Sequence, residues 1–244
     1  DFSRIDKDRF EAYLLSRENS AFDPALENFD KRRMTRPISE YWINSSHNTY
    51  LTGDQLTSHS SVEMYLNALY RGCRCLELDI WDSGEYDEGA QPIPVVWHGH
   101  TMTSKILFID IIKALKIFLN FNPDSYPLIL SFENHCSIPY QDVMAEQLIE
   151  VLGDSLYIPT EASLLGRLPS PEDMRGLIVI KGRRPDKSSE NDDDFEYDSD
   201  EDDDDLDSEI QKNPLAKQTI APQLARLTLF HGCKLKTWDT SLRN

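Results

Sequence analysis

Short apolar runs alternate with segments of helical periodicity along most of the chain. The apolar runs have the length of buried β-strands and occupy residues 41–44, 75–81, 94–99, 127–134, 176–182 and 226–233. Between them, the pattern predicts helices over residues 60–72, 106–119 and 140–153. Regular alternation of strand and helix predicts a parallel sheet with right-handed crossovers. We therefore expect an α/β fold of the (β/α)8 barrel type, with about six of the eight strands in this chain and a short helical segment before them.

The helix predicted over residues 106–119 indicates which of its faces is buried. Asp110, Lys113 and Lys116 recur three residues apart on one side. The other side is apolar and consists of Phe108, Ile111, Ile112, Leu115, Phe118 and Leu119. This pattern is typical of an amphipathic helix that faces a core. The three charges also argue against a membrane span, which needs ~20 largely uncharged residues.

The other two helices carry signals at their ends. Ser60 and Glu63 have the spacing of a capping box, and Gly72 stands where that helix should stop. The last helix follows Pro139 and ends at Gly153. We therefore expect both helices to keep close to the predicted boundaries.

The negative charge of the chain is concentrated in one segment. Residues 190–209 hold 14 carboxylates and no Lys or Arg, so removing them from the net charge of −18 leaves −4. Charge repulsion and the scarcity of apolar residues predict a disordered linker there. The remainder lacks the basic footprint of a nucleic-acid-binding protein.

Cysteine usage fits neither a disulfide framework nor the usual zinc spacing. The four cysteines are Cys73, Cys75, Cys136 and Cys233. Together with a charged start that does not look like a signal peptide, they indicate a reduced, cytoplasmic protein. The first residue is not Met, and we expect the chain to be part of a longer protein.

Polar side chains follow or end most of the predicted strands. In a parallel α/β barrel, functional side chains lie where the strands end at their C-terminal edge. The residues at that edge are His47, Asn48, Glu77, Asp79, His98, Glu133, Lys181, Arg183 and Arg184. Each of them alone has an ordinary structural explanation, such as a turn cap or a surface charge. Their convergence on one edge indicates a functional site.

The residue types at this edge suit metal-dependent phosphoryl chemistry. Asn48, Glu77, Asp79 and Glu133 offer only oxygen ligands, which select Ca²⁺ or Mg²⁺ over zinc. Of two nearby imidazoles, one can neutralise charge on a phosphate and the other can protonate a leaving alcohol. Adjacent Lys and Arg side chains suit a substrate with further phosphates. The residues alone therefore predict metal-dependent cleavage of a phosphodiester.

Five segments resemble, in order and spacing, the X half of eukaryotic phosphoinositide-specific phospholipase C. They read SSHNTYLTGDQL, GCRCLELDIWD, HGHTMTSKILF, YPLILSFENHC and KGRR, and the resemblance covers residues 36–187. It implies a calcium-dependent enzyme that cleaves phosphatidylinositol 4,5-bisphosphate to diacylglycerol and inositol 1,4,5-trisphosphate through a cyclic phosphodiester. It also implies peripheral association with the anionic inner face of a membrane.

The same resemblance implies which metal ion the oxygen donors bind. It implies that Asn48, Glu77, Asp79 and Glu133 hold Ca²⁺. It further implies that Glu77, or alternatively Glu133, accepts the proton of the inositol 2-hydroxyl.

The histidines and the basic residues also receive roles from the resemblance. His47 would stabilise the pentacoordinate phosphorane, and His98 would protonate the diacylglycerol oxygen. Lys181 and Arg183 would bind phosphates on the inositol ring. Lys is common in the family at the position of Arg183, which leaves the headgroup preference open.

The remaining segments match other parts of the family. Residues 1–30 resemble the helical end of an EF-hand region, but Arg9 stands where a calcium loop would end in Glu, so we expect no ion there. Residues 188–212 correspond to the acidic linker between the X and Y halves, and residues 213–244 to the start of the Y half. An anionic tether is repelled by an anionic leaflet, and this predicts a restraint on activity.

Two other functions remain open at the level of sequence. One is a catalytically inactive phosphoinositide-binding or scaffold protein, against which the presence of both His47 and His98 argues. The other is a glycerophosphodiesterase-like barrel, which also uses His and Glu-x-Asp at strand ends. The cluster KGRR favours a polyphosphorylated ring over bare glycerophosphate.

Overall fold

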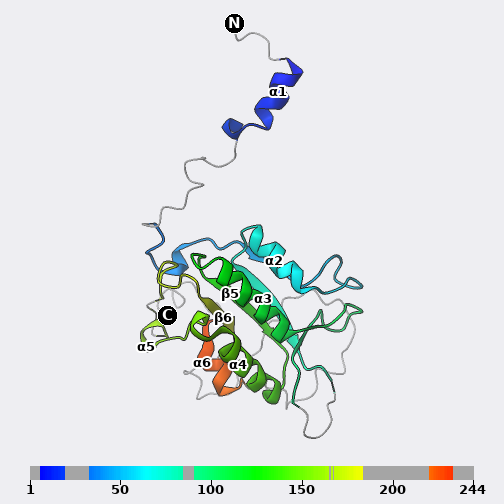
Figure 1. Cartoon of the computed structure of the whole chain (residues 1–244), viewed down its shortest axis with the longest axis vertical. Coiled ribbons are helices and arrows are strands. Elements are labelled where there is room, and N and C mark those ends of the chain that lie inside the picture. Colours follow the sequence, from blue (N-terminus) through cyan, green and yellow to red (C-terminus); the bar gives the residue numbers. More distant parts are fainter. Residues whose placement is uncertain are drawn as a thin grey trace, which may run out of the picture.

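The computed structural model describes residues 6–19, 33–84, 91–164, 166, 168–183 and 220–232 (Figure 1). Its α-helices are α1 (Lys7–Leu14), α2 (Val62–Tyr70), α3 (Phe108–Phe121), α4 (Ile138–Leu152), α5 (Glu161–Leu164) and α6 (Pro222–Leu227). Its strands are β1 (Ser45–Ser46), β2 (Cys75–Trp81), β3 (Val95–Val96), β4 (Ile106–Leu107), β5 (Leu128–Asn134), β6 (Ile178–Gly182) and β7 (Thr228–His231). Short 3-10 turns cover Arg17–Asn19, Ile38–Glu40 and Gly153–Ser155.

The described strands form one mixed sheet with a parallel part. Strands β1, β2, β5, β6 and β7 pair in parallel and follow one another in chain order, as in a β/α barrel. The longest pairing joins β2 to β5, from Cys75 opposite Ile129 to Ile80 opposite Asn134. The expected α/β fold is therefore confirmed, as a partial barrel.

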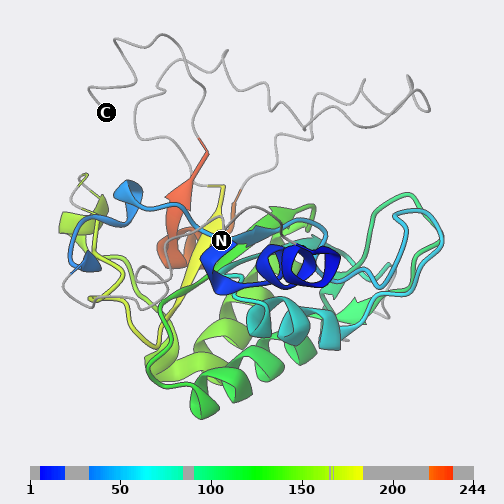
Figure 2. The ribbon, with the colours of Figure 1, turned by 90° about the horizontal axis from the view of Figure 1, so that it is seen from above.

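Three helices cover the outer face of this sheet. Figure 2 shows α2, α3 and α4 together on one side of the strands. Leu76, Leu78 and Ile80 of β2 are fully buried on that side. All six apolar residues predicted for the face of α3 are buried, which confirms the amphipathic pattern. The buried apolar side chains of these helices and of β2 belong to one apolar cluster.

The inner face of the sheet changes from apolar to polar along the strands. At the N-terminal end of the strands, Cys75, Ile129 and Val179 pair with one another and belong to an apolar cluster. Two residues further along, the paired residues are Glu77, Ser131 and Lys181, and beyond them Asp79 pairs with Glu133. The polar residues of β2 and β5 therefore gather at the C-terminal edge.

One predicted parallel strand is wrong. Residues 94–99 contribute only β3, which pairs antiparallel with β2 and forms a hairpin with β4. The first two residues of the helix predicted over 106–119 form β4 instead. The link from β2 to β3 contains Gly and Pro and no helical pattern, and a parallel return needs a crossover, usually a helix. An antiparallel pairing is therefore the one this link supports.

The first predicted strand is displaced. Residues 41–44 form no strand, and β1 begins at Ser45, which pairs with Cys75, the first residue of β2. In this register, the residues before Ser45 lie beyond the first residue of β2. Asn44 is still close enough for its carbonyl to accept hydrogen bonds from the backbone N–H groups of Arg74 and Cys75. The last predicted strand, 226–233, is also wrong in part, because α6 continues to Leu227 before β7 starts.

The helix ends differ slightly from the prediction. The cap of α2 is Ser61 rather than Ser60, and its hydroxyl accepts from the backbone N–H of Glu63. Gly72 follows α2 with φ of 93°, a conformation that favours glycine. Helix α4 begins at Ile138, before the predicted residue 140, and ends at Leu152.

Within the predicted N-terminal segment, the described part is helical over α1, which buries none of its residues and lies apart from the sheet (Figure 1). The acidic segment 190–209 lies outside the described residues, as do Arg184 and Cys233. Across the described ranges, no helix combines the length and the apolar character needed to cross a bilayer.

Candidate metal centre

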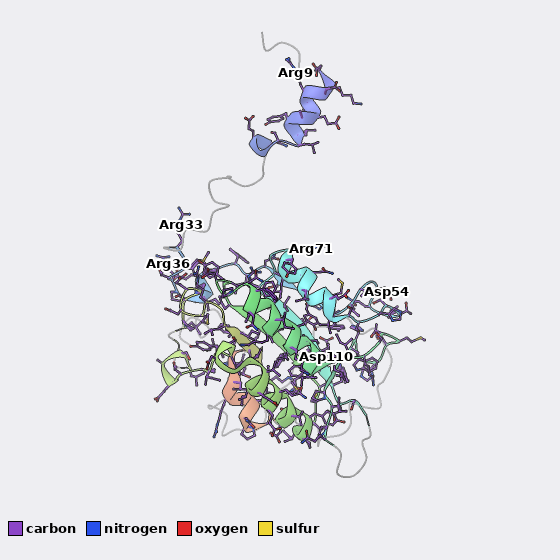
Figure 3. The ribbon with its side chains drawn as sticks, viewed as in Figure 1. Arg9, Arg33, Arg36, Asp54, Arg71 and Asp110 are labelled. Carbon is purple, nitrogen blue, oxygen red and sulfur yellow. The ribbon has the colours of Figure 1, made fainter. Side chains whose placement is uncertain are left out.

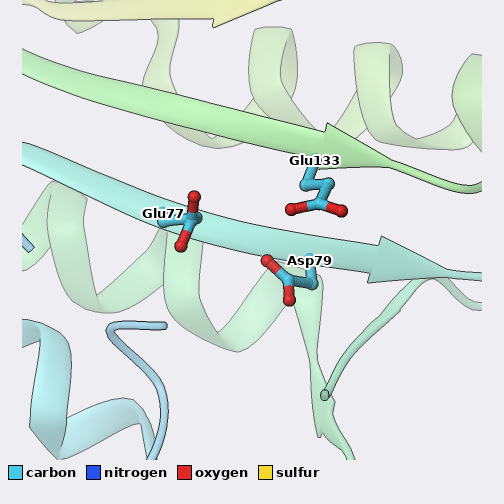
Figure 4. Close-up of side chains that lie close together, drawn as sticks. All are labelled: Glu77, Asp79 and Glu133. Carbon is cyan, nitrogen blue, oxygen red and sulfur yellow. The ribbon is translucent and has the colours of Figure 1, made fainter. Parts of the chain in front are cut away.

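Three carboxylates meet at the C-terminal edge of the sheet. Glu77 and Asp79 project from the same face of β2, and Glu133 projects from the neighbouring β5 (Figure 4). Each offers an oxygen atom within 4.8 Å of the oxygens of the other two. This convergence follows from the alternation of side chains along β2 and from the register that sets Asp79 opposite Glu133.

The three carboxylates concentrate negative charge in a small volume. Asp79 is only 6% exposed, and burial, together with the nearby charges of Glu133 and Glu77, raises its pKa to about 7 against a hydrogen bond from Tyr50 that lowers it. Its Oδ1 atom is buried and has no hydrogen-bond partner among the described residues. A buried anionic oxygen without a donor is costly. The donor set of carboxylate oxygens therefore fits a hard divalent cation.

Asn48 lies beside this cluster and is held in an unusual backbone conformation. Its φ is 45°, in the left-handed region that Asn tolerates better than most residues. In this conformation its backbone N–H donates to Glu77 Oε2 over 2.7 Å. Its side-chain Oδ1 lies 3.0 Å from the hydroxyl of Tyr50, and the same hydroxyl donates to Asp79. The predicted fourth oxygen donor is therefore joined to two of the three carboxylates.

Of the two predicted catalytic histidines, His47 lies beside the carboxylates and His98 does not contact them through a hydrogen bond or ion pair within the described residues. His47 Nε2 lies 3.7 Å from Glu77 Oε2, and its side chain is 75% exposed, so a substrate can reach it. His98 follows β3, and within the described residues no hydrogen bond or ion pair joins it to the three carboxylates. Its backbone carbonyl accepts from Thr101, and its Nδ1 atom is buried and finds no partner within the described part of the chain.

Glu133 has a partner of its own. His135 Nε2 lies 3.1 Å from Glu133 Oε1, and this hydrogen bond holds the pKa of Glu133 below its ordinary value, with His47 and Arg183 adding to the effect. The carboxylate of Glu133 is thus ionised and oriented from one side.

Lys181 occupies the inner face of β6. Its Nζ donates to Ser131 Oγ over 3.0 Å, in the same cross-strand row as Glu77. Arg183 follows β6 directly and is half-buried. The two basic residues therefore border the carboxylates on the β6 side, while His47 borders them on the β1 side.

Sequence reasoning gave no role to Tyr50 or His135, although both contact the carboxylates. A tyrosine two residues after Asn48 reads as a core residue, and its ring is fully buried. His135 stands two residues after Glu133, outside the strand. The one signal in the sequence is that each residue follows a predicted ligand by two positions. This spacing indicates a contact only when the register of β1, β2 and β5 is known.

The chain also matches a known protein family. The family described as "Phosphatidylinositol-specific phospholipase C, X domain" matches residues 34–184. The chain is 47% identical over 176 residues to 1-phosphatidylinositol 4,5-bisphosphate phosphodiesterase delta-3-A of Danio rerio, covering 72% of this chain and 21% of that protein. It is 49% identical over 178 residues to the gamma-2 phosphodiesterase of Rattus norvegicus, covering 72% of this chain and 13% of that protein.

A solved structure is similar over nearly the whole chain. The crystal structure of PLC21 from S. officinalis superposes with a TM-score of 0.67 at 32% identity, covering 98% of this chain and 29% of that one. The chain thus spans about a fifth or less of the length of delta-3-A and gamma-2. Because the family match covers more than half of its residues and includes every strand from β1 to β6, the chain belongs to the phosphatidylinositol-specific phospholipase C family, with residues 34–184 as its X domain.

Proposed function

We propose that this chain supplies the X half of the catalytic core of a calcium-dependent phosphoinositide-specific phospholipase C. The reaction is cleavage of phosphatidylinositol 4,5-bisphosphate to diacylglycerol and inositol 1,4,5-trisphosphate through a cyclic phosphodiester. The observation that carries the proposal is the convergence of Glu77, Asp79 and Glu133 at one edge of the sheet. The names of the relatives from Danio rerio and Rattus norvegicus support the substrate.

The proposed calcium ligands are Asn48, Glu77, Asp79 and Glu133. When bound, calcium would withdraw charge from the reacting phosphate and make the inositol 2-hydroxyl more acidic. Four oxygen donors of this kind suit calcium, which accepts six to eight oxygens in flexible geometry and would complete its shell with water or substrate. The buried and unpartnered Oδ1 of Asp79 supports the assignment.

The proton transfers are assigned to side chains that surround the proposed ion. Glu77, or alternatively Glu133, accepts the proton of the 2-hydroxyl as it attacks phosphorus. His47, which is exposed beside Glu77, donates to the phosphate oxygens as negative charge develops on them. His98 protonates the departing diacylglycerol oxygen, and its unpartnered Nδ1 leaves that imidazole without a competing hydrogen bond there.

The phosphates on the inositol ring are assigned to Lys181 and Arg183. Both border the carboxylates, and Lys181 is exposed at the end of β6. Arg presents a planar fork of donors that binds phosphate oxygens in pairs, whereas Lys acts as a point charge. A ring with two phosphates therefore suits this pair better than an unphosphorylated headgroup.

Two exposed apolar side chains support action at a membrane surface. Leu56 and Met102 are 67% and 84% exposed, and the Met102 N–H donates to the Leu56 carbonyl over 2.9 Å. Asp54 organises the same loop by accepting from the backbone of Leu56 and Thr57, and Figure 3 marks it at the periphery. These side chains support the proposal that the protein acts in the cytoplasm and is recruited to the anionic inner face of a membrane, without a nucleic-acid partner.

The test compares two acidic residues in the intact protein. Asp79→Asn should abolish calcium-stimulated release of inositol phosphate from vesicles that contain phosphatidylinositol 4,5-bisphosphate. Asp110→Asn removes an exposed carboxylate from α3 and should leave the release unchanged. Wild-type release that persists in excess chelator would remove calcium from the proposal. Absence of release under all conditions would favour the inactive binding protein.

A further inference from the structure

Tyr50 connects two of the proposed ligands through a single hydroxyl group. Its ring is fully buried, and its oxygen lies 2.5 Å from Asp79 Oδ2 and 3.0 Å from Asn48 Oδ1. Asp79 comes from β2, whereas Asn48 belongs to the turn that follows β1. The phenol therefore joins Asn48 and Asp79, which are 31 residues apart along the chain.

The hydroxyl cannot serve both oxygens in the same way. It carries one hydrogen, which it can donate to one acceptor at a time. The shorter contact to the carboxylate is the stronger one, because hydrogen bonds to charged acceptors are short and strong. The phenol oxygen is then an acceptor for the second partner. Asn48 can meet it with its NH₂ group after a half turn of its amide, which changes the outline of the side chain very little.

These hydrogen bonds determine which oxygen atoms of Asp79 and Asn48 remain available to bind a cation. With Asp79 Oδ2 engaged by Tyr50, Oδ1 is the carboxylate oxygen that stays buried without a donor within the described residues. With the amide of Asn48 turned, its carbonyl oxygen no longer faces the phenol. Figure 4 shows one oxygen of Asp79 directed toward Glu77 and Glu133.

We propose that Tyr50 is a positioning residue that orients Asp79 and Asn48 as ligands, by donating to one and accepting from the other. The inference rests on the proposed calcium site and adds a residue that acts through its ligands. Partners that hold metal ligands in place typically affect metal affinity by about 10- to 100-fold. Tyr50 should therefore govern calcium affinity rather than the chemical step.

A second buried tyrosine provides a matched control. Tyr65 is also fully buried, and its hydroxyl donates over 3.0 Å to the backbone carbonyl of Glu77. Tyr65→Phe and Tyr50→Phe each remove one buried phenol oxygen, keep the ring and leave one acceptor in the same region without its donor. The two substitutions differ in that the Tyr65 hydroxyl makes no hydrogen bond to the side chain of a proposed ligand within the described residues.

The experiment measures calcium binding by titration calorimetry and calcium activation of turnover in the intact protein. Tyr50→Phe should weaken calcium binding about tenfold, and raise the activating calcium concentration equally. Its turnover at saturating calcium should stay within about twofold of wild type, because the added ion restores the ligand geometry. Tyr65→Phe should leave calcium affinity within about twofold, whatever it does to the melting temperature.

The possible outcomes separate the role of Tyr50 from the existence of the calcium site. Equal calcium affinity in wild type, Tyr50→Phe and Tyr65→Phe would overturn the role of Tyr50. Equal losses in both variants, or a loss of turnover in Tyr50→Phe that saturating calcium does not restore, would reduce Tyr50 to a structural residue. If wild type itself binds no calcium, the proposed function fails first.

Discussion

The imidazole of His135 lies flat against the indole of Trp81, with ring centroids 3.8 Å apart and planes inclined by 9°. The indole in turn lies close against Gly99, where an added Cβ would be 2.1 Å from a ring carbon of Trp81. Stacking sets the plane of the imidazole and directs its Nε2 to Glu133 Oε1. A residue beyond the end of β5 thereby contacts a carboxylate on β5.

His135→Ala should weaken calcium binding about tenfold, because Glu133 loses the donor that orients it. His59→Ala is the matched control, since it removes an exposed imidazole from the loop before α2. Calorimetric titration of both variants with calcium checks the prediction. Equal affinities would show that the stacked histidine does not control the ligand.

His98→Ala should lower turnover by about two to four powers of ten, because the leaving diacylglycerol oxygen would depart without a proton donor. Calcium affinity should stay close to that of wild type, since His98 contacts none of the proposed ligands. Steady-state assays and a calcium titration of the same preparation measure both quantities. Turnover at the wild-type level would remove His98 from the mechanism.

The stability of the calcium-free protein should depend on pH through Asp79. Its pKa is raised to about 7, chiefly by burial, so between its ordinary value and about 7 the folded state binds more protons than the unfolded state. The free energy of unfolding therefore falls as pH rises through this range. Calcium binding needs the ionised carboxylate. The increase in melting temperature that calcium causes should therefore be larger at pH 8 than at pH 6.

Asp79→Asn isolates this effect from other titrating groups. In chelator, wild type should lose stability relative to the variant as pH rises from about 5 to 8, because only wild type acquires the buried charge. Thermal unfolding of both proteins at several pH values measures the difference. A difference that does not change with pH would mean that Asp79 titrates at its ordinary value.

Deleting residues 190–209 should raise activity on anionic vesicles more than on a soluble substrate. The segment carries 14 carboxylates, and an anionic leaflet repels them within a Debye length of its surface. A Gly/Ser segment of equal length serves as the control for the loss of chain length. The gain should shrink at high salt. Equal gains on both substrates would argue against electrostatic restraint.

The sequence predicted much of the candidate site because alternation along a strand is a local property. Glu77 and Asp79 are two residues apart, so they lie on the same face of their strand. Leu76, Leu78 and Ile80 are apolar and occupy the opposite face, which packs against the helices, so Glu77 and Asp79 face inward. The same reasoning identified the buried face of α3. It needed no knowledge of partner strands.

The prediction of β3 failed because strand direction is not a local property. Residues 94–99 carry the composition of a strand, but the link before them decides whether they return in parallel or antiparallel. The start of β1 depends likewise on where β2 begins, since a strand exists only where a partner offers hydrogen bonds. No pattern within either segment contains this information.

The sequence by itself determined which residues face inward and which kinds of ligand they offer, because side-chain direction and chemistry follow from neighbours along the chain. The tertiary structure alone decided that Asp79 stands opposite Glu133 and that Tyr50 and His135 contact these two carboxylates. Those contacts depend on the register between strands, which is set by the packing of the whole sheet against its helices.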